Sequence, residues 1–192
     1  MLKWLISIVY GIFTRVYPWL VKLVSFNNDK AKAWIKGRQN QQAFIDKISK
    51  WSQGNTIWVH AASSGEYQQV LPIMKAYKTR LPEARFVLTF CSPSGYEQWK
   101  ENSIADAVGY LPREASKDLN KFIHTIQPAC VWIVKNEFWF RFLKKLQKES
   151  IPTIFISTYV KAKSHIFYPY FKDIIKKVDH FFVQDETSSI NL

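Results

Sequence analysis

The sequence predicts an α/β domain in which helices cover both faces of a parallel β-sheet. From Thr56 onward, short apolar runs alternate with stretches in which apolar residues recur at helical spacing. Strands that are buried on both faces are almost continuously apolar, and parallel strands need a helical crossover between them. Together these features indicate a Rossmann-like sheet, which an apolar N-terminal helix precedes.

The first expected element is this apolar helix, over residues 1–28. Its segment from Trp4 to Val24 is strongly apolar but contains Arg15, Pro18 and Lys22. Three placements fit the pattern: a shallow anchor in a membrane interface, an imperfect membrane-spanning helix, and a helix that docks on the domain. Because a charge at the centre of a bilayer is costly, the pattern favours the interfacial anchor.

Residues 29–52 form a linking segment of one or two amphipathic helices, and the Rossmann-like domain occupies residues 53–192. The expected strands are 56–61, 85–91, 107–112, 130–134, 153–158 and 180–184. The expected helices are 67–81, 95–102, 116–126, 138–150 and 169–178. Pro72 lies inside the first of these helices, so a kink or a restart is expected there.

The charge and composition of the chain restrict its partners. The 27 Lys and Arg residues exceed the 15 Asp and Glu residues, and the net charge of +12 indicates an anionic partner. The basic residues are dispersed and no recognition motif is present, which argues against nucleic acid. Cys91 and Cys130 lie in apolar runs, as buried free thiols do. The four histidines show no metal-ligand spacing, so we predict no bound catalytic metal and no other cofactor.

The segments that follow the expected strands are the candidates for chemistry, because ligands of such sheets bind beyond the carboxyl ends of the strands. These segments are rich in hydroxyl groups, glycines and carboxylates. They are SSGE (63–66), SPSG (92–95), PRE (112–114), KNE (135–137), TYVK (158–161) and QDE (184–186). All of them fall on one edge of the sheet, where the sequence therefore predicts a polar site.

Two glutamates of these segments are candidate catalytic groups. With Ser64 as the expected N-cap, Glu66 lies in the first turn of a helix, where the macrodipole favours the ionised carboxylate. A capping role alone also explains Glu66, and a tight turn alone explains Gly65. Glu137 follows another strand of the same sheet, so the two carboxylates can converge as a base and an orienting group. Spacing leaves both interpretations open.

Other common catalytic motifs are missing from the sequence. Neither serine lies in a G-x-S-x-G elbow, and there is no P-loop or dinucleotide fingerprint. The SPSG segment can still present backbone amides to a phosphate at the start of a helix. A basic group on or before one helix is either a solvated face or an anion site; it consists of Lys135, Arg141, Lys144 and Lys145.

Six motifs, in their order and spacing, resemble the Kdo transferases. They are WVHAASSGEY, FCSPSGYE, YLPRE, VKNEFW, IPTIFIST and FFVQDE. Enzymes of this family transfer 3-deoxy-D-manno-octulosonic acid (Kdo) from CMP-Kdo to a lipid A precursor in lipopolysaccharide biosynthesis. The apolar N-terminal segment and the KGR sequence from Lys36 to Arg38 also resemble the family.

The resemblance implies a GT-B glycosyltransferase, with two Rossmann-like domains and the active site between them. This chain resembles the N-terminal acceptor domain, and the C-terminal domain that binds CMP-Kdo is absent. The implied activity is that of an inverting glycosyltransferase, which this half alone is not expected to show. The implied partners are CMP-Kdo through the missing domain, the lipid A precursor, and the cytoplasmic face of the inner membrane.

The resemblance also assigns roles to residues. It implies that Glu66 is the general base and that Glu137 orients the acceptor or Glu66. The residues expected to contact substrate are Ser63, Ser64, Gly65, Ser92, Ser94, Gly95, Asn136, Trp139 and Arg38. Lys135, Asn136, Ser157 and Tyr159 depart from the family pattern. The alternative function is a non-catalytic membrane or lipid-binding module on the same fold.

Overall fold

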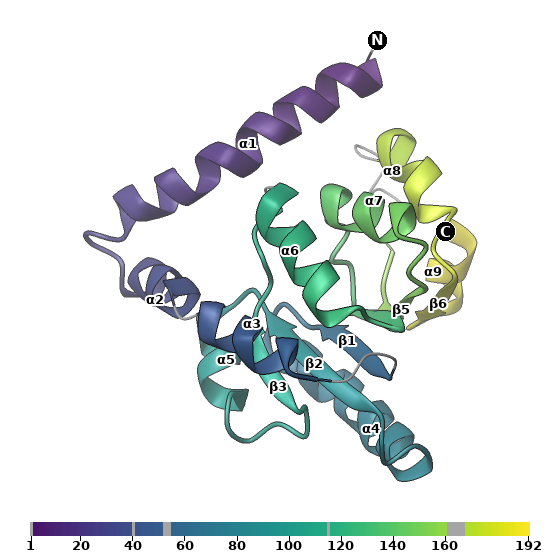
Figure 1. Cartoon of the computed structure of the whole chain (residues 1–192). Helices are drawn as coiled ribbons and strands as arrows, with labels where there is room; N and C mark the ends of the chain where they lie inside the picture. The colour runs from purple at the N-terminus through teal and green to yellow at the C-terminus, as the bar shows by residue number, and fades with distance from the viewer. Residues whose placement is uncertain (1, 40, 52–54, 115, 161–167) are drawn as a thin grey trace.

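A six-stranded parallel sheet forms the centre of the protein in the computed structural model, which describes residues 2–39, 41–51, 55–114, 116–160 and 168–192 (Figure 1). The strands are β1 (Thr56–His60), β2 (Arg85–Phe90), β3 (Ala107–Tyr110), β4 (Cys130–Val134), β5 (Thr153–Thr158) and β6 (His180–Val183). Their order across the sheet is β3-β2-β1-β4-β5-β6, and every neighbouring pair is parallel. The predicted α/β class is therefore confirmed.

The strand order reverses between β1 and β4. From β1 the chain proceeds outward through β2 to β3, then returns to the other side of β1 and proceeds through β4 and β5 to β6. The register places His60 of β1 beside Thr89 of β2 and Ile133 of β4. In sheets of this kind a ligand crevice lies outside the carboxyl ends of the strands at such a switch point. The end of β1 is thus the place at which a site is expected.

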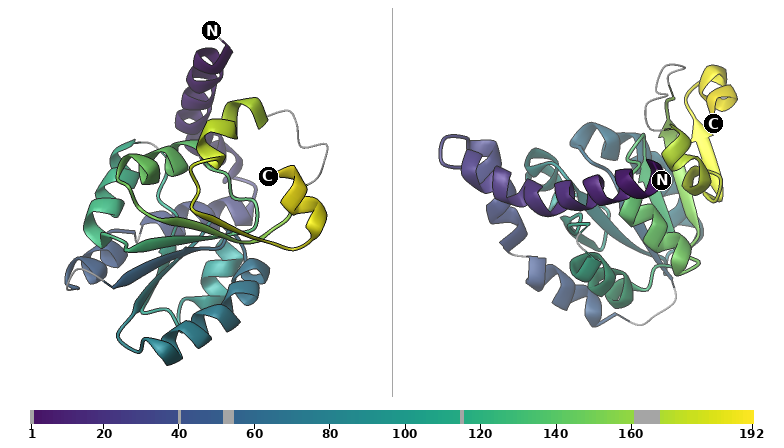
Figure 2. Two further views of the ribbon diagram at one scale, coloured as in Figure 1. Left: turned by 90° about the vertical axis from the view of Figure 1, so that its right-hand side faces the viewer. Right: turned by 90° about the horizontal axis from the view of Figure 1, so that it is seen from above.

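Helices cover both faces of the sheet, as the two views in Figure 2 show. One face is covered by α4 (Ser64–Arg80) and α5 (Pro93–Trp99), and the other by α3 (Gln41–Ser49), α6 (Ser116–Ile126), α7 (Phe140–Lys148) and α8 (Tyr168–Ile175). Successive strand residues enter opposite cores: Trp58 packs with the second group, and Val59 packs with α4 and α5. The last element is α9 (Glu186–Asn191).

Helix α4 runs through Pro72 as one element, so the expected restart at this residue is wrong. Proline removes one backbone hydrogen bond from a helix, but packing can hold the helix together. Here Val70 and Met74 lie on either side of Pro72, and both are fully buried against the sheet. The burial of these side chains keeps the two halves of α4 in one helix.

The N-terminal segment forms α1 (Leu2–Val24), and the linking segment forms α2 (Asp29–Gln39) and α3. The predicted boundary between residues 52 and 53 lies outside the described residues. Among the described helices, none has the length and apolar character needed to cross a membrane. The exposed apolar side chains of α1 include Ile8, Val9, Ile12, Phe13, Val16, Trp19, Leu20 and Leu23.

A buried glutamate fastens α1 to the domain. The Glu114 side chain accepts hydrogen bonds from the backbone N–H groups of Arg141 at 3.0 Å and Phe142 at 3.1 Å, at the start of α7. It also accepts the hydroxyl hydrogen of Tyr10 from α1. The Tyr10 ring meets Phe140 edge to face, with 5.9 Å between the ring centroids. Glu114 therefore satisfies orphan donors of a helix N-terminus and joins two helices that are distant in sequence.

Candidate functional site

Helix α4 begins directly beyond β1 and brings Glu66 to the carboxyl edge of the sheet. The N-cap is Ser63, with φ −137° and ψ 167°, and Ser64 is already helical, so the predicted N-cap at Ser64 is wrong by one residue. The shift makes Glu66 the third helical residue. From there its carboxylate reaches back to accept from the backbone N–H of Ala62 at 2.5 Å and of Ser63 at 3.3 Å.

The carboxyl group of Glu66 has a raised pKa. Burial is the main cause and the negative charge of Glu137 is the second, while the bonds from Ala62 and Ser63 act in the opposite direction. Glu66 is only partly buried, so a ligand on this edge can reach its carboxylate. A half-buried carboxylate with a raised pKa is suited to accept a proton near neutral pH.

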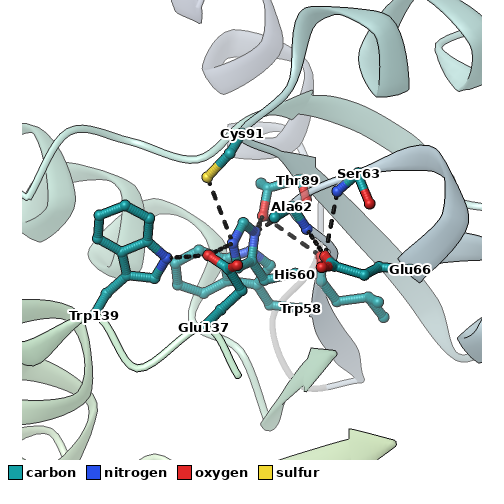
Figure 3. Close-up of polar contacts among 10 residues, drawn as sticks. Trp58, His60, Ala62, Ser63, Glu66, Thr89, Cys91, Glu137 and Trp139 are labelled. Carbon is teal, nitrogen blue, oxygen red and sulfur yellow. Dashed lines mark hydrogen bonds and ion pairs between the residues drawn. The ribbon is translucent and has the colours of Figure 1, made fainter. Parts of the chain in front are cut away.

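Glu137 follows β4 and lies on the same edge as Glu66 (Figure 3). Its Oε2 atom accepts the indole N–H of Trp139 at 2.6 Å and lies 3.9 Å from Nε2 of His60. Burial alone would raise the pKa of Glu137, but the contacts with His60 and Trp139 outweigh it, and the pKa is lowered. The negative charge of Glu137 also contributes to the raised pKa of Glu66, so Glu137 is the more acidic of the two carboxyl groups. Their convergence as a base and an orienting group stays a prediction.

His60, the last residue of β1, is completely buried beneath this site. Its Nδ1 atom lies 3.0 Å from the backbone oxygen of Thr89. A carbonyl oxygen only accepts, so Nδ1 carries a hydrogen and Nε2 faces Glu137 and the Cys91 Sγ, at 3.8 Å. Burial disfavours the imidazolium, but the contacts with Cys91 and Glu137 outweigh it and raise the pKa of His60 to about 10. His60 therefore forms an ion pair with Glu137.

Sequence reasoning missed His60 and Cys91 as parts of the site. The histidines show no ligand spacing along the chain, but the fold brings ligand atoms of His60, Cys91 and Glu137 within 4.8 Å of one another. These residues follow or end β1, β2 and β4, three neighbouring strands. The signal that could have found His60 is its place as a polar residue at the end of an apolar strand.

The predicted serines of the site are largely occupied by contacts within the protein. The Ser64 hydroxyl donates to Gln98 at 2.7 Å and accepts the indole N–H of Trp99 at 2.8 Å, so it joins α4 to α5. Ser92 is the N-cap of α5, and its hydroxyl lies 2.7 Å from that of Ser94. The Ser64 contacts thus hold the end of α5 beside the start of α4, whereas the Ser92–Ser94 contact is local to the start of α5.

The two predicted glycines differ in their surroundings. Gly65 is exposed, and an added Cβ would meet no atom within 4 Å, so the edge is open beside Glu66. Gly95 is buried, and an added Cβ would come within 2.8 Å of the Phe90 ring and 3.1 Å of the Ser64 backbone nitrogen. Gly95 is therefore needed for the close packing of α5, whereas Gly65 leaves space for a ligand.

The loop after β4 is held by its own hydrogen bonds. Asn136 exchanges two bonds with the backbone of Tyr159 beyond β5, one of them from the Tyr159 N–H at 3.1 Å. Trp139 is the N-cap of α7 and donates to Glu137. Lys135 has a left-handed backbone with φ 61°. Asn136 and Trp139, which were predicted to contact substrate, thus help to position Glu137, the group that faces His60.

Arg38 lies in a groove at the same edge of the sheet, beside the end of β3. Its guanidinium stacks on Trp34 at 3.8 Å and on Tyr110 at 4.7 Å, measured to the ring centroids. Burial lowers the pKa of Arg38 to about 10, which still leaves it charged at neutral pH. Within the described part of the chain, its buried Nε atom has no hydrogen-bond partner.

The groove has a volume of about 620 Å³ and combines cationic with apolar side chains. The cations that line it are Lys22, Arg38, Arg113 and Lys121, and the apolar residues include Trp19, Trp34, Ile35, Ile45 and Leu111. Asp118 is the acidic residue of the lining and is paired with Arg113 at 2.7 Å. Such a lining suits a ligand with both phosphate and apolar parts.

This strand order, with a polar site at the switch point, defines a Rossmann-like ligand-binding domain. A family model described as 3-deoxy-D-manno-octulosonic-acid transferase (kdotransferase) matches residues 34–192. The chain belongs to the Kdo transferase family.

Curated relatives with similar sequences carry the name 3-deoxy-D-manno-octulosonic acid transferase, and two of them illustrate the similarity. The protein from Aquifex aeolicus (strain VF5) is 31% identical over 120 residues, which is 62% of this chain and 32% of the relative. The protein from Chlamydia muridarum (strain MoPn / Nigg) is 26% identical over 155 residues, which is 77% of this chain and 35% of the relative. The chain thus spans about a third of the length of these relatives.

Proposed function

We propose that this chain is the acceptor-binding half of an inverting Kdo transferase. In this proposal Kdo passes from CMP-Kdo to a lipid A precursor in lipopolysaccharide biosynthesis, and a separate donor domain supplies CMP-Kdo. The observation that carries the proposal is the environment of Glu66. It is a partly buried carboxylate with a raised pKa on the open edge of the switch point, in a member of the Kdo transferase family.

In the proposed reaction Glu66 is the general base. Its carboxylate takes the proton of an acceptor hydroxyl while that oxygen attacks the anomeric carbon of Kdo. The bond from this carbon to the phosphate oxygen breaks as the new bond forms, and CMP leaves with the electron pair. A single displacement from the opposite side inverts the anomeric centre. General-base catalysis of this kind contributes roughly 10²–10⁴ in rate.

Glu137 is a positioning residue in this mechanism. The His60 ion pair and the Trp139 hydrogen bond keep it ionised, so its negative charge favours the protonated form of Glu66. That raises the proton affinity of the base. Gly65 leaves the approach to Glu66 open, because no atom lies within 4 Å of the position of its missing Cβ.

The groove around Arg38 is the proposed binding site for a phosphate of the acceptor. The lipid A precursor carries two phosphates on an apolar molecule, and the lining offers four cationic residues together with indole and aliphatic side chains. The unpaired Nε donor of Arg38 gives one phosphate oxygen a buried partner.

We propose that α1 lies in the interface of the inner membrane on its cytoplasmic side. Its exposed apolar side chains would enter the headgroup region, and Arg15 and Lys22 would meet anionic lipids. Helix α1 joins α2 near the groove, to which it contributes Trp19 and Lys22. An acceptor drawn from the membrane would therefore meet the groove before it reaches Glu66.

The first experiment is binding of a bisphosphorylated lipid A precursor to the 192-residue chain in mild detergent, with the dephosphorylated precursor as the control. The proposal predicts selective binding of the bisphosphate. Equal affinity for both compounds from a folded sample would contradict the assignment of the groove. Transfer is tested in an enzyme that joins this chain to a donor domain, in which Glu66→Gln should reduce turnover by about 10²-fold or more.

The alternative is a non-catalytic lipid-binding module, which the exposed face of α1 and the cationic groove also favour. The two functions share the binding result and differ in the transfer result. If the joined enzyme binds the precursor and CMP-Kdo but shows no transfer with or without the Glu66→Gln change, the module is the better description.

A further inference from the structure

Three side chains with metal-binding atoms meet at the switch point: His60, Cys91 and Glu137. The His60 Nε2 atom lies 3.8 Å from the Cys91 Sγ and 3.9 Å from the Glu137 Oε2, and all three ligand atoms lie within 4.8 Å of one another. Around a tetrahedral zinc ion such atoms are about 3.4–3.6 Å apart, given zinc–ligand bonds of about 2.0–2.3 Å. The separations in the structure are longer than this, so a bound ion would draw the Cys91 Sγ and the Glu137 Oε2 closer to the His60 Nε2.

The surrounding residues orient the ligand atoms toward one another, and a bound ion would displace the proton from the Nε2 of His60. The Nδ1–H of His60 points at the backbone oxygen of Thr89, which leaves Nε2 as the atom that faces the cluster. A histidine ligand commonly has such a carbonyl partner on its second nitrogen. The indole N–H of Trp139 holds the Glu137 carboxylate in the same way. Both contacts fix ligand orientation before an ion arrives.

The cluster is open on one side. His60 is fully buried, but Cys91 and Glu137 are partly exposed, and 21% of the Glu137 side chain is accessible. An ion can therefore enter from the edge of the sheet. Three protein ligands leave one position of a tetrahedral ion for water or another ligand.

We propose that His60, Cys91 and Glu137 form a binding site for a zinc-like divalent cation. Imidazole nitrogen, thiolate sulfur and carboxylate oxygen together select a borderline ion such as Zn²⁺ or Co²⁺, whereas Mg²⁺ and Ca²⁺ prefer oxygen ligands alone. The observations behind this site do not depend on the proposed Kdo transfer, because they are contacts within this chain. Its occupation would engage Glu137 and so alter the environment of Glu66.

The test is titration of the untagged 192-residue chain with Co²⁺, followed by absorption spectroscopy. The proposal predicts a thiolate-to-cobalt charge-transfer band that saturates at one ion per chain and disappears when Zn²⁺ displaces the cobalt. Mg²⁺ should not displace it. No charge-transfer band from a folded sample would overturn the proposal, whether or not the chain binds a lipid A precursor.

Variants identify the ligands. Cys91→Ser should abolish the band and Cys130→Ser, the matched control, should retain it. Glu137→Gln should keep the sulfur band but weaken binding at least tenfold. Trp139→Phe, which keeps a ring but loses the N–H, should weaken binding by about 10- to 100-fold. A band that persists in Cys91→Ser, or that is lost in Cys130→Ser, would assign the thiolate to another residue and overturn the site. Circular dichroism of each variant confirms that it is folded.

Discussion

Glu66 and Glu137 are coupled across the switch point: burial and then the Glu137 carboxylate raise the pKa of Glu66. The two residues follow different strands, β1 and β4, which lie side by side in the sheet. The coupling depends on an ionised Glu137, and the contacts with His60 and Trp139 maintain that state. The contacts that keep Glu137 ionised therefore also influence the pKa of Glu66, a neighbouring carboxylate that is more accessible to ligands than the buried His60–Glu137 pair.

Replacement of Glu137 by glutamine should lower the pKa of Glu66. The change removes a negative charge and leaves the burial of Glu66 and its bonds from Ala62 and Ser63 in place. The raised pKa should therefore move toward the ordinary value of a glutamate, although burial keeps it somewhat above. The measurement is a titration of the ¹³C-labelled glutamate carboxylates of the chain by NMR.

Glu83→Gln is the control for this titration, because Glu83 is exposed beyond the opposite end of α4. It should leave the pKa of Glu66 unchanged. His60 also faces this pair and lowers the pKa of both carboxyl groups, so its signals should be followed in the same experiment. An unchanged Glu66 pKa in Glu137→Gln would show that the two carboxylates are not coupled.

The raised pKa of Glu66 also predicts a dependence of stability on pH. The folded chain binds this proton more tightly than the unfolded chain. The stabilisation from Glu66 is therefore fully present below the unfolded pKa of about 4.5 and is lost as the pH rises through the folded pKa. In Glu66→Gln this loss is absent, so the variant should gain stability relative to the natural chain as the pH rises from the unfolded pKa through the folded pKa of Glu66.

Urea unfolding at several pH values measures this difference. The glutamine oxygen can still accept from Ala62 and Ser63, so the variant keeps the helix-capping contacts. A free-energy difference between the two chains that is constant with pH, or that falls as the pH rises, would contradict a raised pKa for Glu66.

Tyr10→Phe should destabilise the protein and loosen α1. The change removes the hydroxyl that donates to the buried Glu114 and keeps the ring against Phe140. A hydrogen bond to a charged group contributes about 1.5–3 kcal/mol. Thermal unfolding should show a loss of this size, and hydrogen exchange should increase in α1 more than in the sheet.

Tyr17→Phe is the matched control for this change, because Tyr17 is exposed on the same helix. Its effect on the free energy of unfolding should be below about 0.5 kcal/mol. If both variants lose the same stability, Glu114 does not fasten α1.

The sheet could be predicted from the sequence because every strand is an apolar run bounded by a helical pattern. Positions of helix starts were less certain: local pattern placed the cap of α4 at Ser64, whereas the extended backbone belongs to Ser63. The prediction that α4 restarts at Pro72 was wrong because the burial of Val70 and Met74 depends on tertiary packing, which a local pattern does not contain. Hydrophobic patterns along the chain indicate which face of a helix or strand is buried. Tertiary packing decides whether a helix continues through a residue such as Pro72.

The candidate site was predicted only in part. Glu66 and Glu137 follow strands, so the topology of parallel sheets brings them to one edge. His60 and Cys91 were missed because their proximity to Glu137 depends on the order β2-β1-β4, which no spacing in the sequence encodes. The groove around Arg38 requires α2 to pack beside Tyr110, a contact equally invisible in a linear pattern.

Lys135→Gly should be more stable than Lys135→Ala by about 1 kcal/mol. Lys135 directly follows β4 and has φ 61°, a left-handed conformation that a Cβ atom disfavours and that glycine adopts without strain. Alanine removes the lysine side chain but keeps the Cβ, so the comparison isolates the backbone. Chemical unfolding of the two variants measures the difference. Equal stabilities would mean that the loop relaxes away from this conformation at little cost.

Arg38→Lys should weaken binding of a bisphosphorylated lipid A precursor although the charge is kept. The planar guanidinium stacks on Trp34 and Tyr110, and an ammonium group cannot reproduce this arrangement or present the buried Nε donor. A loss of about 0.5–2 kcal/mol corresponds to an affinity about two- to thirtyfold lower. Arg80→Lys, at the end of α4 and outside the groove, should leave the affinity unchanged. Isothermal titration in mild detergent compares the three proteins, and equal affinities would place the phosphate elsewhere on this basic chain.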